Sequence, residues 1–453
     1  MKKIKKIISI GSLSSLLLMP LVAASCKKND NDEKVQIINN ESNPQTSKQM
    51  TPPPNSINDN DDKPDKNEKT DNNQNLVSPV NPNETNNEEE KKKIEEEKKK
   101  IEEEKKLKEK QEQEDKKNVE KVEKIIKEQK DAFGSFHTRK DFLDQISVFA
   151  KEKGIENLKL ADGNEDKTFK VGENDPENKV KLRLGTYEFE VQLGKVLKDR
   201  VATKYYIEND KEKIIEDTDG KFSNLENNEQ NVVITQIGYS LKSKEYSTNE
   251  KVIEIDNMPK NTIKVPKHLP LKINSLKDAF KELNSEKVLD LDKWNVSNVT
   301  NMHSMFFEAK KFNQDISKWN TENVTNMIGL FSGAENFNQP LNSWNVSKVT
   351  NMYEMFIGAH KFNQDLNEWN VSNVTNMERM FLEAKSFNGR IDNWNVESVT
   401  ELDETFLHAN EFQQDLSNWK IKKNVIERKN HSIFNSNYPH TEKVLKAWME
   451  NNK

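Results

Sequence analysis

The stretch from 344 to 387 reads WNVSKVTNMYEMFIGAHKFNQDLNEWNVSNVTNMERMFLEAKSF and decides the fold. It holds one 25-residue unit and most of the next, so that Trp369 and Phe381 repeat Trp344 and Phe356. Self-similarity at a period of this size indicates stacked structural repeats. The same 25-residue period extends toward both the N-terminus and the C-terminus from this stretch. The residues that repeat with it are Trp294, Trp319, Trp394 and Trp419, then Val299, Val324, Val349, Val374 and Val399, and Phe306, Phe331 and Phe406.

Each unit carries the pattern of one strand and one short helix. Leu366, Trp369 and Val371 are spaced as L-x-x-W-x-V, the shape of the leucine-rich-repeat strand signature. Thr375 is a suitable helix N-cap. The apolar residues that follow at i, i+3, i+4 and i+7 predict a two-turn helix; they are Met377, Met380, Phe381 and Ala384. We therefore predict an α/β repeat solenoid, leucine-rich-repeat-like, over 263–453.

The unit WNVSNVTNMxxMFxxAxxFNQDL resembles the repeat of the BspA-type leucine-rich-repeat surface lipoproteins common in mycoplasmas. The resemblance covers about Leu271 to Trp419. It departs from the usual leucine-rich repeat at Val374, where an Asn is expected, and this leaves the turn geometry open. The resemblance implies surface exposure, adhesion to host material and antigenic variation.

The terminal coils of such a stack need caps. Residues 273–292 predict a degenerate first coil, and Thr441 to Met449 predicts a capping helix with Val444, Leu445, Trp448 and Met449 on its apolar face.

A small α+β module is predicted over 132–262. Thr138 and Asp141 form a capping-box pattern before an amphipathic helix that ends at Gly154. Alternating apolar residues on both sides of Gly185-Thr186 predict a β-hairpin over 180–193. Residues 232–239 and 252–255 predict further strands, and we find no site in this module.

Two polar segments precede the module. Residues 26–87 are rich in Asn, Asp, Lys and Pro and predict a disordered tether. Residues 88–131 begin EEEKKKIEEEKKKI, in which glutamates precede lysines by three or four positions, as in a solvated single helix. A weak coiled coil is the alternative, because Ile94, Ile101 and Leu107 supply about one apolar residue per heptad. Whether two chains associate there stays open.

The N-terminus has the pattern of an export signal over 1–25: basic residues, an apolar run, then small residues before Cys26. A retained transmembrane helix is the alternative, although the apolar run is short for a span. Ala24, Ser25 and Cys26 resemble a bacterial lipobox, from which Ala23 departs. The resemblance implies that Cys26 is diacylated, and two acyl chains give stable anchoring in the lipid bilayer.

Composition narrows the function classes. The chain of 453 residues has 71 basic and 77 acidic residues, a balance that gives no reason to expect a nucleic-acid partner. A single cysteine excludes internal disulfides and zinc sites built on several thiolates. Recurring Asp315, Asp365 and Asp415 could hold Ca²⁺, but Pro340 and Arg390 interrupt their row. We expect no enzyme activity, no cofactor and no metal.

Repeated residues are better explained by packing than by binding. The tryptophans could stack sugars, and Asn313, Asn338, Asn363 and Asn388 could contact a ligand, but core packing and turn hydrogen bonds are the more ordinary roles. Sequons such as Asn295-Val-Ser297 recur only because the repeat recurs. Variable positions are the better candidates, and the candidate binding face consists of Tyr353, Glu354, Glu378 and Arg379 on the helix side and Asn367, Glu368, Asp392 and Asn393 on the strand side.

These observations predict a surface lipoprotein anchored to the extracellular face of the cell membrane. Its solenoid would bind a host extracellular protein or glycan. One alternative is a structural or variable decoy antigen without a specific ligand. Another is an enzyme that uses the 132–262 module, which would require a pocket with perturbed titratable groups.

Overall fold

The computed structural model describes residues 86–453 except 224, 226–229, 243–251, 428–431 and 452–453. All described residues belong to one unit, Asn83–Lys453. The predicted signal peptide, Cys26 and the tether up to residue 85 lie outside the described residues. Within the described part, no helix combines the length and the apolar composition needed to cross a membrane.

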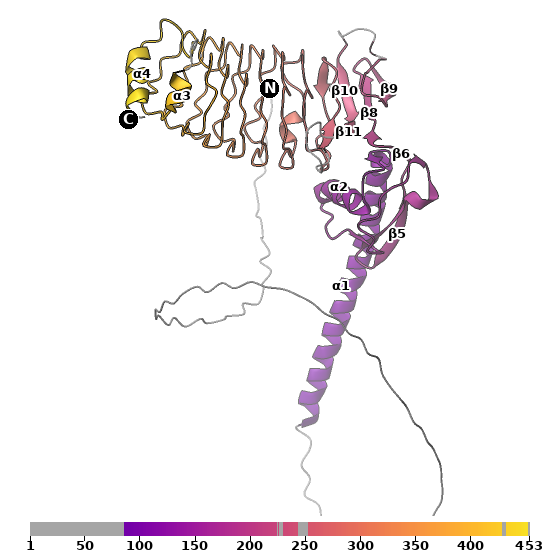
Figure 1. Ribbon diagram of the computed structural model, residues 1–453. Coiled ribbons are helices and arrows are strands. Elements are labelled where there is room, and N and C mark those ends of the chain that lie inside the picture. The colour runs from indigo at the N-terminus through magenta and orange to yellow at the C-terminus, as the bar shows by residue number, and fades with distance from the viewer. Residues whose placement is uncertain (1–85, 224, 226–229, 243–251, 428–431, 452–453) are drawn as a thin grey trace, which may run out of the picture. The chain divides into compact units, whose positions relative to one another are not determined.

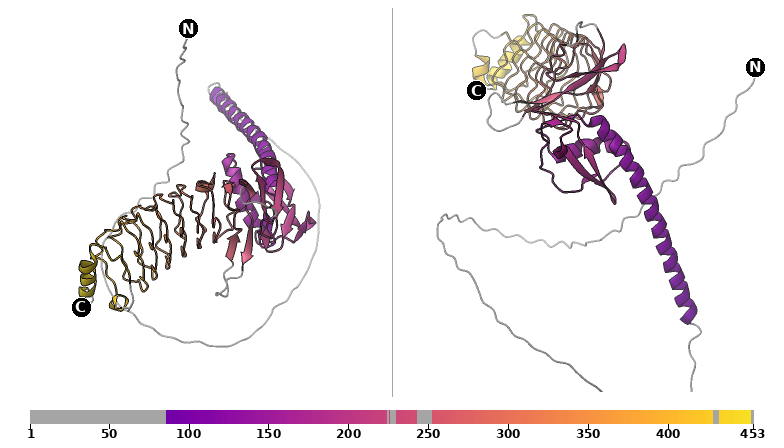
Figure 2. Two further views of the ribbon diagram at one scale, coloured as in Figure 1. Left: turned by 90° about the horizontal axis from the view of Figure 1, so that it is seen from above. Right: turned by 90° about the vertical axis from the view of Figure 1, so that its right-hand side faces the viewer.

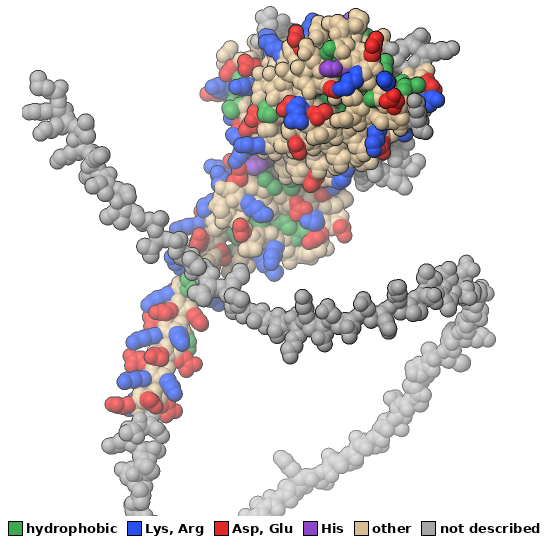
Figure 3. All heavy atoms as spheres, turned by 90° about the vertical axis from the view of Figure 1, so that its left-hand side faces the viewer, with side chains coloured by type: hydrophobic (Ala, Val, Ile, Leu, Met, Phe, Trp, Pro, Cys, Tyr) green, Lys and Arg blue, Asp and Glu red, His purple; other side chains and the backbone are tan. Residues whose placement is uncertain are grey.

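Helix α1 (Asn86–Gln129) has two halves in different surroundings. From Glu88 to Gln111 every residue is exposed, and Figure 3 shows basic and acidic side chains alternating along this half. The second half carries Val122, Ile125 and Ile126 at helical spacing, and all three are buried in a hydrophobic core. The structure thus differs from the solvated spacer expected over 88–131, because the second half of the helix is part of a folded module.

That module, which we call the α2 module, is built on helix α2 (Arg139–Glu152). Thr138 and Asp141 form both hydrogen bonds of the predicted capping box. The predicted hairpin is also confirmed: strands β4 and β5 pair antiparallel around Gly185, whose φ is +58°. The sheets have strand orders β1-β6-β3 and β2-β4-β5. Their elements are β1 (Phe133–Gly134), β2 (Lys159–Leu160), β3 (Gly172–Glu173), the 3-10 helix η1 (Pro176–Asn178), β4 (Lys179–Leu184), β5 (Tyr187–Gln192) and β6 (Lys195–Leu197).

Two further small sheets follow, with strand orders β13-β10-β8-β9 and β12-β11-β7. Their core is continuous with that of the repeats, whereas the α2 module has a core of its own. The predicted single module over 132–262 therefore comprises two units, and the second, which we call the capping sheets, covers the first coil. The strands are β7 (Arg200–Val201), β8 (Thr203–Ile207), β9 (Asp210–Asp217), β10 (Val232–Gln236), β11 (Tyr239–Lys242), β12 (Val252–Ile255) and β13 (Thr262–Lys264).

The repeats form a stack of coils that runs from the capping sheets to helix α4 (Figures 1 and 2). Single parallel bridges join each coil to the next. The bridged residues are Ser275, Asn301, Asn326, Asn351, Asn376 and Glu401. Residues 265–422 are all described, and the one regular element among them is the 3-10 helix η2 (Leu291–Lys293). Helices α3 (Lys423–Ile426) and α4 (Thr441–Glu450) close the stack, and α4 matches the predicted capping helix.

The predicted α/β leucine-rich-repeat-like solenoid is therefore wrong. The regular elements are small, mostly antiparallel sheets and few helices, and the coils contain neither the predicted strand at 366–371 nor the predicted helix at 375–384. The predicted strand is a turn, in which the Trp369 amide donates to the Leu366 carbonyl at 3.1 Å.

The predicted helix is replaced by consecutive turns whose alternate amides bond to the next coil. The Glu354 amide donates to the Glu378 carbonyl at 3.1 Å, and the Phe356 amide to the Met380 carbonyl at 2.8 Å. The coils lie too close for helices. The ring centroids of Phe356 and Phe381 are 5.5 Å apart, and those of Trp369 and Trp394, elsewhere in the coil, are 6.2 Å apart. An α-helix is about 10–12 Å wide, so side-by-side helices would force the coils apart.

Three aromatic columns fill the core of the stack. Two are phenylalanine columns and one is the tryptophan column, and all of these rings are buried. The cap continues each column: Phe434 stacks on Phe406, Tyr438 on Phe412, and Trp448 of α4 on Trp419, at 5.6, 5.7 and 6.2 Å between ring centroids. The last coil is thereby covered by the same kind of surface that an additional coil would present.

Candidate functional site

The candidate binding residues fall into two sets at different points of the coil. Tyr353, Glu354, Glu378 and Arg379 lie on the consecutive turns that follow the bridged asparagines. We call them, together with Glu404 of the next coil, the Arg379 cluster. Asn367, Glu368, Asp392 and Asn393 lie beside the tryptophans and make separate contacts.

Contacts across three successive coils hold the Arg379 cluster together. The Arg379 guanidinium donates to Glu404 Oε2 at 2.7 Å and to the Tyr353 hydroxyl at 3.2 Å. Its distances to carboxylate oxygens of Glu354 and Glu378 are 3.7 and 3.9 Å. The Arg379 side chain remains 37% exposed. Three carboxylates therefore surround one guanidinium at a surface that solvent and a partner can reach.

Electrostatics within the cluster follow from this crowding. Partial burial, with nearby Asp403, Glu401 and Glu404, raises the pKa of Glu378 against the opposing effect of Arg379. The hydrogen bond to Glu354 and burial raise the pKa of Tyr353. The hydrogen bonds to Glu404 and Tyr353 raise the pKa of Arg379. The carboxylates therefore stabilise the charged Arg379 guanidinium, and the Tyr353 hydroxyl stays protonated at neutral pH.

The backbone under the cluster is left-handed. Glu354, Arg379 and Glu404 have φ of 56°, 58° and 55°, a region that glycine adopts with least strain. Ser304 and Gly329 occupy the same repeat position with φ of 52° and 58°. The turn geometry is thus set by the stack and tolerates different side chains, so that this position varies while the backbone does not.

The second candidate set has a structural role in the stack. The side-chain oxygen of Asn367 accepts the backbone N–H of Asn393 at 2.9 Å, and Asn342 accepts that of Glu368 in the same way at 3.0 Å. Asp392 lies 3.4 Å from Arg390. Glu368 and Asn393 of this set are exposed, and Asn367 and Asp392 are half-buried, as are all members of the Arg379 cluster. The second set is the weaker candidate because its contacts support the backbone of the next coil and do not join its side chains to one another.

The other repeated polar residues and the tryptophans form hydrogen bonds with backbone atoms of the coils. The indole N–H of Trp369 donates to the Leu341 carbonyl and that of Trp394 to the Leu366 carbonyl, each at 2.8 Å. The asparagine at the start of the consecutive turns forms an Asx turn. In one coil, for example, the side-chain oxygen of Asn376 accepts the backbone N–H of Glu378. Asp315 and Asp415 cap the amides of Ser317 and Ser417. Among the residues that the structure describes, no group of three or more His, Cys, Asp or Glu side chains is placed to hold a metal ion.

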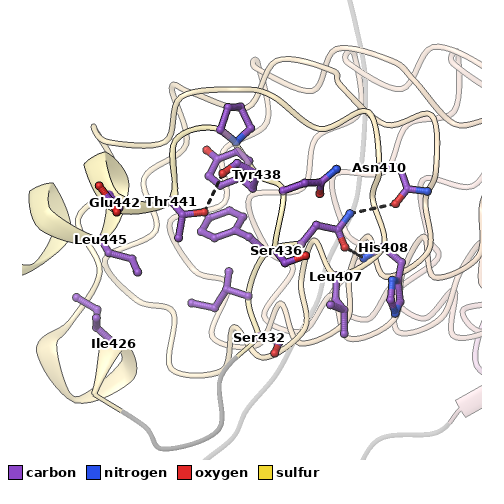
Figure 4. A pocket seen from close by; sticks show the side chains of 15 residues that line it. Leu407, His408, Asn410, Ile426, Ser432, Ser436, Tyr438, Thr441, Glu442 and Leu445 are labelled. Atoms are coloured by element: carbon purple, nitrogen blue, oxygen red, sulfur yellow. Dashed lines mark hydrogen bonds between the residues drawn. The ribbon is translucent and has the colours of Figure 1, made fainter.

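A hollow of about 1300 Å³ lies where the last coil meets the cap (Figure 4). Its lining combines Leu407, Ile426 and Leu445 with polar residues of the loop before α4. The Asn435 amide donates to Asn410 Oδ1 at 3.1 Å, and the Thr441 hydroxyl donates to the Tyr438 carbonyl at 2.9 Å. The first of these hydrogen bonds attaches the loop to the coil stack, and the second joins the loop to α4.

Sequence reasoning missed the junction between the α2 module and the capping sheets. His137 is 2% exposed, and its Nε2 lies 2.8 Å from the Tyr239 hydroxyl of β11. Burial lowers the pKa of His137 to about 4, and the nearby Lys272 adds to this while Asp141 opposes it. Lys272 in turn bonds Asp141 at 2.9 Å. No periodicity links residues 102 positions apart, and the one adjacent apolar residue, Phe136, is a weak signal of burial.

Comparison with known proteins gives one similarity. Residues 274–383 and 364–448 match the family model described as "Mycoplasma protein of unknown function, DUF285", which is related to BspA-like repeat proteins. The match covers the coil stack and its C-terminal cap. No model specific to BspA or to leucine-rich repeats matches. No curated protein and no solved structure matches the chain.

Proposed function

We propose that this chain, whose coil stack matches a Mycoplasma repeat family, is a membrane-anchored surface lipoprotein that binds host extracellular proteins or glycans. Three features support the proposal. The repeat unit resembles that of BspA-type surface lipoproteins, the N-terminal residues resemble a lipoprotein signal ending at Cys26, and the charged first half of α1 can hold the folded part away from a surface.

The observation that carries the proposal is variation of side chains on an unvarying backbone. Ser304, Gly329, Glu354, Arg379 and Glu404 share one left-handed turn position. The residue that follows each of them is buried; these residues are Met305, Leu330, Met355, Met380 and Thr405. A surface of this kind is rigid, so a partner loses little binding free energy to ordering it.

The Arg379 cluster favours a partner with basic side chains. Glu354, Glu378 and Glu404 outnumber the one guanidinium among them, and all three are partly exposed. Tyr353 adds a half-buried aromatic ring beside these charges, and tyrosine and arginine are common at the energetic centres of protein interfaces.

Charge reversal tests this face. We expect the full chain to capture a host extracellular protein or glycan saturably from an array. Glu378→Lys with Glu404→Lys should weaken at least tenfold the binding of a partner that carries basic side chains. The reason is that the variant turns the acidic surround of Arg379 into a basic one. Affinity is measured by surface plasmon resonance for each partner that the array identifies.

Two matched variants complete the test. Glu368→Lys with Asp392→Lys changes the same charge at the second candidate set, and exposed Glu322→Lys changes the surface elsewhere; both should bind as the unaltered chain does. Loss in the second-set variant alone would place the binding face beside the tryptophans. Absence of saturable binding by any form would contradict the proposal and favour the alternative, a structural or variable decoy antigen.

Anchoring is tested separately. We expect the full chain expressed in a mycoplasma to incorporate labelled palmitate and to partition with membranes, and Cys26→Ser to lose both properties, because Cys26 is the sole cysteine and two acyl chains are needed for stable anchoring. Surface proteolysis of intact cells reports exposure. Unchanged labelling in Cys26→Ser would contradict lipid attachment at this residue.

A further inference from the structure

A second hollow, of about 440 Å³, lies on the coil stack away from the Arg379 cluster. It spans neighbouring coils and is lined by Glu286, Lys311, Asn313, Asn336, Asn338 and Lys361. We call it the Lys311 hollow. Lys311 and Lys361 are exposed and occupy the same repeat position two coils apart, with half-buried Asn336 at that position in the coil between them. The shorter side chain of Asn336 leaves room between the two lysines.

Two of the three asparagines that line the hollow, Asn313 and Asn338, present only donors to a ligand. Asn313 Oδ1 accepts the Asn338 backbone N–H at 2.9 Å and Gln339 Nε2 at 2.8 Å. Both lone pairs of this oxygen are therefore used, and the backbone N–H fixes which end of the amide is the oxygen. Asn338 Oδ1 likewise accepts the amide of Asn363 and the Nε2 of Gln364. The Nδ2 groups of both asparagines have no acceptor among the described residues and remain available to a ligand.

The two lysines are unpaired among the described residues, unlike their neighbour. Lys310 is held by Glu335 at 3.1 Å and by Glu308 at 3.6 Å, whereas Lys311 and Lys361 make no ion pair there. One carboxylate, that of exposed Glu286, lies at the end of the hollow toward the capping sheets. The hollow therefore offers two ammonium groups joined by amide donors, with a single negative charge at its edge.

From this arrangement we infer that the Lys311 hollow binds a linear saccharide bearing carboxylate or sulfate groups. An extended ligand fits the arrangement best. Coils at this point are 5.9 and 6.1 Å apart, judged by the rings of Phe312, Phe337 and Phe362, so Lys311 and Lys361 are rooted two coil spacings apart along the stack. A compact anion contacts both ammonium groups only when both side chains fold inward over Asn336. A saccharide chain can place an anionic group at each lysine and its hydroxyl and ring oxygens against the Nδ2 donors.

Other polyanions fit less well. An acidic peptide alternates carbonyl acceptors with N–H donors, and its donors would face the donors of the hollow. Single-stranded nucleic acid is held by aromatic stacking in basic grooves, but the aromatic columns of this stack are buried and the chain has a net charge of -6. The inference rests on the surface-binding function proposed above and names a ligand class for it. The site shares no residue with the Arg379 cluster, so variants of the Lys311 hollow and of the Arg379 cluster test the two separately.

Calorimetry on the full chain tests the inference, with a carboxylated hyaluronan octasaccharide and a sulfated heparin octasaccharide as probes. Binding of at least one is expected. Asn338→Asp should weaken it at least tenfold, because aspartate keeps the oxygen that accepts the Asn363 and Gln364 donors while replacing the Nδ2 donor with a negative oxygen. Lys311→Gln with Lys361→Gln should weaken it as strongly and reduce its salt dependence.

The control is Lys348→Gln with Lys420→Gln, which removes the same charge from exposed positions outside the hollow; it should bind within twofold of the unaltered chain. Equal losses in control and test variants would overturn the site in favour of diffuse electrostatics. Equal binding of a neutral chitin oligosaccharide or of polyglutamate would overturn the ligand class. If Asn338→Asp fails to fold, as judged by circular dichroism, Lys311→Gln with Lys361→Gln alone tests whether the saccharide binds in the hollow.

Discussion

Trp369→Ala is expected to lower the free energy of unfolding of the coil stack by about 3–5 kcal/mol, the range for removing a buried large aromatic side chain. Trp369 is 3% exposed. Its ring stacks on Trp394 at 6.2 Å and lies 6.5 Å from Phe356. The change would leave a cavity in the middle of the tryptophan column and remove the donor to the Leu341 carbonyl.

The effect should extend along the stack. In a stack each coil is stabilised mainly by its neighbours, so a defect in a central coil weakens the coupling on both sides. Hydrogen exchange measured by mass spectrometry should show faster exchange in the coils on both sides of Trp369, and urea unfolding followed by circular dichroism gives the free energy. Opening confined to one coil would contradict this nearest-neighbour account.

Two variants calibrate the result. Trp369→Phe keeps an aromatic ring in the column and removes the indole N–H, so it should be less destabilising than alanine. Ser372→Ala changes a half-buried side chain in the same coil and should stay within about 0.5 kcal/mol of the unaltered chain. A loss below 1 kcal/mol in Trp369→Ala would mean that the column contributes little to stability.

Acidification is expected to destabilise the junction between the α2 module and the capping sheets by about 3 kcal/mol. The pKa of His137 is about 4 in the folded protein against 6.5 for an ordinary histidine. The unfolded chain therefore binds the proton first, and the stability from neutral His137 is present above about pH 6.5 and is lost as the pH falls toward 4. The magnitude follows from 1.36 kcal/mol per pKa unit.

The structural cause is a buried imidazole that cannot accommodate a charge. Among the residues that the structure describes, Nδ1 of His137 has no hydrogen-bond partner, and Nε2 contacts the Tyr239 hydroxyl at 2.8 Å. The nearby carboxylate of Asp141 is bonded to Lys272 and to the Thr138 amide. Protonation would place a second positive charge near Lys272 on a ring that is 2% exposed. The junction should therefore loosen before the coil stack does.

Urea unfolding at pH 7 and pH 4.5 measures the loss. His137→Gln keeps a hydrogen-bonding group for Tyr239 without a titratable ring and should remove most of this pH dependence. His408→Gln, at an exposed histidine, should keep it. The carboxylates of Glu152 and Asp415 have pKa values lowered to about 2 by their hydrogen bonds to basic residues, so their contribution is lost only below about pH 4.5. A His137→Gln variant with unchanged pH dependence would contradict the assignment.

Local signals predicted those elements that local interactions stabilise. The capping box of Thr138 and Asp141 marked the start of α2, and Gly185 marked the hairpin turn. Val122, Ile125 and Ile126 of α1 form an apolar stripe at helical spacing in the sequence. This stripe could have predicted that the second half of the helix packs into the core of the α2 module.

The period predicted the stacking and the buried residues but not the backbone. Met377, Met380, Phe381 and Ala384 are buried as their spacing required, yet inward residues of consecutive turns can have the same spacing as one face of a helix. The two structures differ in the acceptors of their backbone amides. In a helix the amides would bond within the same coil, whereas here alternate amides donate to carbonyls of the next coil. A signal did exist: Gly329, Gly333 and Gly358 fall within the predicted helix positions and have positive φ.

The candidate site could be predicted only in part. Variable positions pointed to Tyr353, Glu354, Glu378 and Arg379, which the structure brings together across coils. The same criterion also selected Asn367 and Asp392, because variation along a sequence does not distinguish a side chain that supports the next coil from one that faces a partner. The donor-only asparagines and the His137 junction depend on contacts between distant residues, which no local pattern encodes.

The cap continues all three aromatic columns, with Phe434, Tyr438 and Trp448 as their last members, and this has a consequence for inheritance. Recombination between two repeats of the gene would add or remove a whole coil. The capping sheets and the C-terminal cap would then still cover coils of the same kind. The length of the molecule is therefore a copy-number trait that can change in one genetic event without a compensating mutation. Successive generations of cells can thus carry the same backbone at different reach, with new side chains in the added coils.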